Sequence, residues 1–117
     1  MKTFFITIFL LIFITACSSQ KKNEKYYQTN FCEKINGIIE YKLKDNSRVD
    51  CLTNNLAIEV DWAKKWPEAI GQSLYYSHMT NKKAAIALIA SSKDKKFIHR
   101  ARTICEKYDI EIFIIEK

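Results

Sequence analysis

Several features that would identify a common class of protein are absent from this chain of 117 residues. Its four cysteines form no Cys-x-x-Cys pair and its two histidines are not spaced with them, so the ligand pattern of a zinc site is missing. The sequence contains no internal repeats. Its longest apolar run, Phe4 to Ile14, is too short to cross a membrane as a helix. What remains is one small domain behind a short apolar segment.

The apolar run has the features of an export signal. It follows the positive start Met1-Lys2 and ends at Ile14-Thr15-Ala16-Cys17. Small residues before a cysteine resemble the lipobox of bacterial lipoproteins. The resemblance implies cleavage before Cys17 and attachment of fatty acyl chains such as palmitate to its thiol and new amino group. A plain secretory signal with a chance cysteine is the alternative.

This interpretation divides the chain into a signal peptide (1–16), a lipidated cysteine with a polar, lysine-rich tether (17–25), and a folded domain (26–117). The protein would then be lipid-anchored in the cell envelope. Because Ser18 follows the cysteine, the resemblance favours the periplasmic face of the outer membrane, or the cell surface.

Charge and cysteine content constrain the partners and the compartment. The chain has 19 Lys and Arg against 13 Asp and Glu, a formal net charge of +6. This balance suits a polyanionic partner, either nucleic acid or anionic lipid headgroups. Besides Cys17, three cysteines allow at most one internal disulfide, and Cys32–Cys51 is the preferred pair because both precede or lie in the first hairpin. Cys105 lies on an apolar helix face and is predicted to be a buried thiol.

The pattern of apolar residues predicts an α/β domain with the order α-β-β-β-α-β-α-β. Helices are predicted at 27–35, 66–80 and 95–108, and strands at 38–44, 48–53, 56–61, 84–90 and 111–115. The first three strands form an antiparallel meander. The last two flank a helix and are therefore predicted to be parallel and joined by a right-handed crossover.

Carboxylates crowd the predicted meander. With Asn54-Asn55 as a two-residue turn, Asp50 lies opposite Glu59, and Arg48 lies opposite Asp61 as its ion-pair partner. Clustered carboxylates on adjacent strands repel one another unless a cation lies between them. The alternative is that these acids are simply solvated on an exposed face.

The element order, with acids on the second and third strands, resembles the restriction-endonuclease-like nucleases of the PD-(D/E)xK superfamily. The resemblance covers about Phe31 to Ile115 and depends on the phrases Arg-Val-Asp-Cys-Leu-Thr, Ala-Ile-Glu-Val-Asp-Trp and Gly-Gln-Ser-Leu-Tyr-Tyr. It implies that Asp50 and Glu59 are catalytic and bind Mg²⁺ or Mn²⁺, which polarises the scissile phosphate and activates water. No small-molecule cofactor is expected.

The same resemblance assigns supporting roles to three further residues. Gln72 and Tyr76, one turn apart on a helix, resemble a QxxxY element whose residues position the site and the nucleic-acid backbone. Glu33 matches an acid often supplied by the first helix.

The chain departs from the superfamily at its catalytic lysine. The lysine should stand two residues after Glu59, where this chain has Asp61. Lys65, which leads into the second helix, is the first substitute. Lys42 is the second, because a three-residue turn before Arg48 would place it opposite Asp50.

Three functions remain open on the sequence alone. The leading hypothesis is a membrane-anchored, metal-dependent nuclease that hydrolyses nucleic-acid phosphodiesters. The displaced lysine favours an alternative, a catalytically inactive module of the same fold that binds nucleic acid. The third is a small structural lipoprotein of the envelope whose basic surface faces lipid headgroups.

Overall fold

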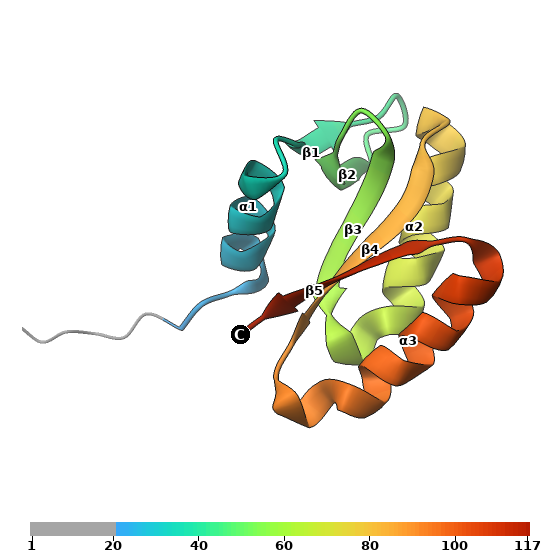
Figure 1. The fold of residues 1–117 in the computed structure, drawn as a ribbon. Helices are drawn as coiled ribbons and strands as arrows, with labels where there is room; N and C mark the ends of the chain where they lie inside the picture. Colours follow the sequence, from blue (N-terminus) through green and yellow to red (C-terminus); the bar gives the residue numbers. More distant parts are fainter. Residues whose placement is uncertain (1–20) are drawn as a thin grey trace, which may run out of the picture.

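A computed structural model describes residues 21–117 as three helices and one mixed five-stranded sheet of order β1-β2-β3-β4-β5 (Figure 1). The elements follow in the order α1 (Glu24–Lys34), β1 (Ile38–Lys42), β2 (Arg48–Leu52), β3 (Leu56–Trp62), α2 (Trp66–Thr80), β4 (Lys83–Ala90), α3 (Lys95–Tyr108) and β5 (Glu111–Glu116), with short 3₁₀ turns before α2 and α3. The predicted fold class, α/β, is therefore confirmed. The predicted signal peptide and the predicted lipidated Cys17 lie outside the described residues.

The predicted helices and strands are all present, with small differences at their ends. β1 and β2 pair antiparallel, as do β2 and β3, whereas β3–β4 and β4–β5 are parallel. Helix α1 begins at Glu24, inside the stretch predicted as tether, because the Asn23 side chain accepts a hydrogen bond from the Tyr26 N–H and caps the helix. Among residues 21–117, no helix is both long and apolar enough to cross a bilayer.

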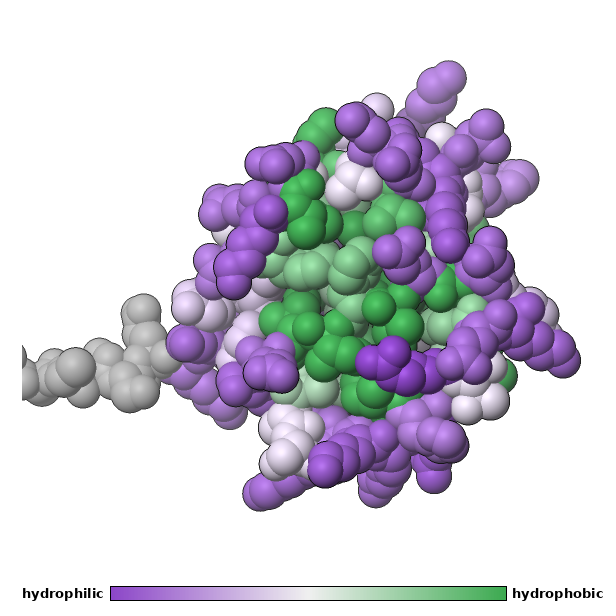
Figure 2. Space-filling model, viewed as in Figure 1, coloured by the Kyte–Doolittle hydropathy of each residue, from purple (hydrophilic) through white to green (hydrophobic). Residues whose placement is uncertain are grey.

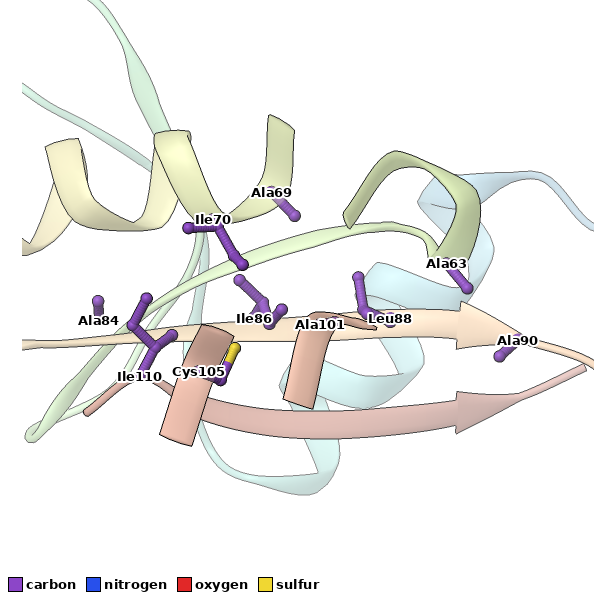
Figure 3. Close-up of a cluster of buried hydrophobic side chains, with 10 residues drawn as sticks. All are labelled: Ala63, Ala69, Ile70, Ala84, Ile86, Leu88, Ala90, Ala101, Cys105 and Ile110. Carbon is purple, nitrogen blue, oxygen red and sulfur yellow. The ribbon is translucent and has the colours of Figure 1, made fainter. Parts of the chain in front are cut away.

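The core lies on both faces of β4. Ile86 and Leu88 point toward α2 and α3, where they meet Ile70, Ala101 and Cys105 (Figure 3). The buried thiol of Cys105 confirms its prediction. The alternate residues of β4, together with Ile58 and Val60 of β3, pack on the other face beneath α1. A strand covered on both faces must be apolar throughout, which explains the continuous run that predicted it.

A disulfide between Cys32 and Cys51 ties α1 to β2, as the sequence predicted. Gly37 packs directly against it: a Cβ atom at this position would lie 2.7 Å from the Cys32 sulfur and still closer to that of Cys51. Any side chain at position 37 would therefore collide with the disulfide, which explains the glycine there.

The meander has the predicted β2–β3 register but not the predicted β1–β2 register. Cys51 pairs with Ile58 across the Asn54-Asn55 turn, as expected. On the other side Lys42 pairs with Arg48, so the prediction that Lys42 faces Asp50 is wrong by two residues. The turn after β1 is longer than the three residues assumed, since strand pairing stops at Lys42 and resumes at Arg48.

Candidate functional site

Four carboxylates gather where β2 and β3 diverge. We call Glu24, Asp50, Glu59 and Asp61 the acidic cluster; they come from α1, β2 and β3. Glu59 and Asp61 are only 6% and 7% exposed, so they are not solvated strand acids. Burial is the largest cause that raises the pKa of each of the four carboxyls. Repulsion from other members of the cluster adds to the rise in pKa for Glu24, Asp50 and Glu59, whereas for Asp61 the added repulsion comes from Glu68.

Asp50 is positioned by the end of the β2–β3 ladder. The recorded pairing ends at Cys51 and Ile58, and the Asp50 Oδ2 atom accepts a hydrogen bond of 2.8 Å from the Val60 N–H. The carboxylate thus satisfies a buried donor in place of a backbone carbonyl. On the other side, the Gln28 Nε2 atom donates to the backbone carbonyl of Asp50 and to Glu40 Oε1, each at 3.0 Å.

Within the acidic cluster, the Glu59 carboxyl has the environment least favourable to ionisation. Its Oε2 atom is buried and has no hydrogen-bond partner in the described structure. Burial first, and the neighbouring Asp50 second, raise the pKa of Glu59 far above its usual range. The pKa of Asp50 is raised less, because the Val60 N–H stabilises its ionised form. At neutral pH the Glu59 carboxyl is therefore neutral, which removes much of the repulsion expected between the two acids.

One supporting residue named from the sequence, Tyr76, lies beside this pair, and a second, Gln72, contacts Tyr76. Burial, followed by the nearby Glu59 and Asp50, raises the pKa of Tyr76 to about 12, so its hydroxyl stays protonated. That hydroxyl donates to Gln72 Oε1 at 3.4 Å. Gln72 itself is exposed at the surface of α2. The structure thus brings Asp50, Glu59 and Tyr76 together.

The candidate lysines and the first-helix acid are arranged differently from the expectation. Lys65 is exposed, and its positive charge opposes the rise in the pKa of Asp61 and of Glu24. Lys42 is exposed at the end of β1 and Glu33 is exposed on α1. Neither is among the groups that shift the pKa of Asp50 or Glu59.

The expected ion pair between Arg48 and Asp61 is not formed. The Arg48 Nη1 atom instead donates to the backbone carbonyl of Glu40 at 3.5 Å. Asp61 accepts a 2.8 Å hydrogen bond from the Trp62 N–H. The pairing failed because β2 leaves β3 before Arg48 comes opposite Asp61.

Sequence reasoning missed Gln28 and Glu24. Gln28 is 3% exposed and links α1 to β1 and β2 through its two hydrogen bonds. A signal was present: Glu24, Gln28 and Cys32 are spaced four residues apart, so they share the helix face that the disulfide turns toward the sheet.

The acidic cluster is a poor fit to the expected Mg²⁺. Among residues 21–117, no three Asp, Glu, His or Cys side chains converge in a way that could hold a metal ion. Mg²⁺ needs oxygen ligands in near-octahedral geometry. One carboxylate oxygen of Asp50 already accepts a hydrogen bond from the Val60 N–H. Metal binding by Asp50 and Glu59 stays an untested prediction, and no chemistry is derived from it.

The cationic side chains gather elsewhere, on α3. The helix contains one acid, Glu106, and carries exposed basic residues along most of its length. These are Lys95, Lys96, Arg100, Arg102 and Lys107. The ion pairs within residues 21–117 are Lys25–Glu40 and Lys83–Asp109, so none of these α3 cations is paired.

A groove of about 770 Å³ runs beside α3 at the carboxyl ends of β4 and β5. We call it the basic groove, because Lys95, His99, Arg102 and Lys117 line it. Ile98 and Ile114 contribute apolar surface, and Glu116 is its one acidic lining residue. Figure 2 shows the apolar centre of one face of the molecule surrounded by hydrophilic side chains.

No family model and no solved structure matches the chain. Two curated proteins of Acanthamoeba polyphaga mimivirus are similar to it, and both are named as KilA-N domain-containing proteins. One is 34% identical over 98 residues, which cover 84% of this chain and 27% of the relative. The other is 30% identical over 100 residues, which cover 85% of this chain and 39% of the relative. The chain thus spans well under half the length of either relative.

These similarities contradict the resemblance to bacterial PD-(D/E)xK nucleases, which no family model supports either. They likewise overturn the leading hypothesis of a membrane-anchored, metal-dependent nuclease, and with it the description of the chain as a lipoprotein hydrolase that uses magnesium. The resemblance failed because its motif is short: an aspartate and a glutamate on neighbouring strands arise here from a buried polar network around Gln28 and the Val60 N–H. What the comparisons add is that the chain is similar to part of two larger KilA-N domain-containing proteins of a giant virus.

Proposed function

We propose that this protein is a module that binds nucleic acid through its phosphate backbone and does not cleave it. The observation that carries the proposal is the set of unpaired cations on α3: five exposed Lys and Arg side chains on one helix with a single acid between them. Similarity to KilA-N domain-containing proteins is consistent with such a role.

Unpaired surface cations favour this function for a physical reason. Each phosphate that a Lys or Arg neutralises releases condensed counterions, and this release drives sequence-independent binding. Cations already engaged in ion pairs contribute less, because the pair must first be broken. The α3 cations have no ion-pair partner among the described residues, although Lys96 and Lys107 lie over the rings of Phe97 and Tyr108. They therefore mark the side of the molecule that a polyanion would approach.

The acidic cluster is a second reason to expect nucleic acid at α3, because it disfavours binding of a polyanion on its own side. It joins four carboxylates, of which Glu59 and Asp61 are buried and offer little surface to a ligand. A phosphate approaching that side would meet like charge, whereas one approaching α3 would not.

The proposal is tested by fluorescence anisotropy with a labelled oligonucleotide and the full chain at several salt concentrations. We expect salt-sensitive binding, with the oligonucleotide recovered intact when Mg²⁺ is present. Arg100→Glu should weaken binding and reduce the magnitude of the slope of log K against log salt concentration by about one. Lys34→Glu, the same charge change on exposed α1, is the matched control and should have the smaller effect. Binding that is absent, or that is equally sensitive to both substitutions, contradicts the proposal.

A further inference from the structure

We propose that the basic groove receives an unpaired nucleotide, so that the protein prefers single-stranded nucleic acid to duplex. This inference rests on the proposed function and specifies its ligand. The phosphate would contact Lys95 and Arg102, and the base would lie against Ile98 and Ile114.

The first argument is the alignment of polar groups along the groove. Lys95, His99 and Arg102 are spaced four and three residues apart on α3, so they form one column along the helix. Seven residues of helix rise roughly 10 Å, which is enough to follow more than one nucleotide of a strand. Lys117 borders the groove at the end of β5, where its N–H is bonded to the Ala90 carbonyl at 3.1 Å, but its ammonium lies over the Trp62 ring, 4.9 Å from the centroid.

The second argument is the apolar floor. Ile98 and Ile114 are half-buried, pack against the core between the helix and the sheet, and line the groove. A site that met only phosphates would gain nothing from such a floor. A nucleotide has both an anionic phosphate and a base with an apolar face, so it matches a cationic rim beside aliphatic side chains.

The third argument concerns the duplex. In double-stranded DNA the faces of the bases are stacked inside the helix and only the phosphates and groove edges reach the protein. In a single strand the bases are free to leave the stack and contact side chains. The groove, at about 770 Å³, is a concave site that an exposed base could enter. Because Ile98 and Ile114 are aliphatic, base contacts would add less than an aromatic platform does, and little base preference is expected.

The charge around the groove is not compensated by its own acid. Glu116 is the one acidic lining residue, and neither it nor the lining cations Lys95, Arg102 and Lys117 take part in an ion pair among the described residues. The net charge of the lining is therefore positive, which favours an anionic ligand. Charge alone would not distinguish a nucleotide from a protein surface that carries carboxylates. The apolar floor makes that distinction, because a base can lie against it.

The experiment compares single-stranded oligothymidylate with a duplex of the same length, using the full chain. Arg102→Glu tests the rim and Ile98→Ser tests the floor, with Arg102→Gln as a milder rim variant. Lys96→Glu, on α3 but outside the groove lining, is the matched control. Circular dichroism checks that each variant is folded.

We expect Arg102→Glu to weaken single-strand binding by about tenfold or more and Ile98→Ser to weaken it by roughly threefold to tenfold, with a smaller effect on the duplex. Lys96→Glu should affect both ligands alike. If the groove variants and Lys96→Glu weaken both ligands equally, the groove is not the site, although the proposed function stands. If neither ligand binds, or if only vesicles of phosphatidylcholine and phosphatidylglycerol bind, both the inference and the proposed function are overturned.

Discussion

The acidic cluster and the basic face of α3 are opposite in charge and also opposite in burial. The carboxylates lie where β2 separates from β3, with Glu59 and Asp61 almost fully buried, whereas the cations of α3 are exposed. Burial changes what a charged residue can do: the Glu59 carboxyl gives up its charge, while the lysines and arginines keep theirs and stay free to meet a ligand. A cluster of acids in a sequence therefore identifies a functional site less reliably than a row of unpaired, exposed cations.

The largest expected effect is a loss of stability on the acidic side of the molecule that leaves binding at α3 unchanged. Cys32→Ala together with Cys51→Ala removes the disulfide that holds α1 over the acidic side, and we expect the free energy of unfolding to fall by about 3 kcal/mol, as for a loop of this size. Urea unfolding measures the change. Reduction of the unsubstituted protein should reproduce the loss. Nucleic-acid binding by the folded fraction should not change, and a parallel loss of binding would show that the two regions are coupled.

The next effect is on binding alone. Arg100→Glu combined with Arg102→Glu should weaken binding of single-stranded DNA more than tenfold, because two phosphate contacts become repulsions. Both side chains are exposed and unpaired, so the free energy of unfolding should change by no more than about 0.5 kcal/mol. Anisotropy and urea unfolding on the same samples test this contrast. A large destabilisation would mean that α3 carries its charge for structural reasons.

A smaller effect is expected from pH on the acidic side. The folded-state pKa of Glu59 is raised by burial and by Asp50, so the folded protein binds a proton that the unfolded chain has lost. Stability from this proton is complete below the unfolded pKa of about 4.3 and is lost as pH rises through the folded-state pKa. Glu59→Gln, which cannot ionise, should flatten this decline and be more stable than the unsubstituted protein at alkaline pH by about 1–2 kcal/mol. Unfolding free energies measured from pH 5 to pH 9 that fall equally in both proteins would contradict the assignment.

The smallest effect concerns an ion pair that the sequence predicted and the structure lacks. Arg48→Ala removes an exposed side chain whose one recorded contact is a 3.5 Å hydrogen bond to a backbone carbonyl. We expect a change of less than about 0.5 kcal/mol in the free energy of unfolding. A double-mutant cycle with Asp61→Asn should give no coupling, and coupling above that level would indicate that the two side chains interact in solution.

The periodicity of the sequence was sufficient for the fold but not for the site. Runs such as 84–90 and the helix beginning at Trp66-Pro67 are dictated by local rules of burial and capping, so their positions were predicted within a few residues. The end of the β2–β3 ladder depends on long-range geometry: Asp50 replaces a backbone acceptor for Val60, and Gln28 reaches it from α1. Those contacts join residues far apart in the chain. The spacing of Gln28 four residues before Cys32 places it on the face toward the sheet but does not specify its partners.

The mistaken function has the same origin. The strand acids were interpreted through a short motif that specifies residue types and spacing but not burial. The cations of α3 do not form a sequence motif. They become candidates for ligand binding only because the structure shows that they are exposed and have no ion-pair partner among the described residues.

The central claim is that nucleic acid approaches α3 and the basic groove, not the acidic cluster. The most direct measurement is a titration of the isotope-labelled protein with oligothymidylate, followed by backbone amide NMR shifts. We predict shifts concentrated in residues 91–107 and 114–117, with the amide of Val60, which reports on Asp50, unmoved. Shifts centred on Val60 and its neighbours in β2 and β3, with α3 silent, would contradict the account.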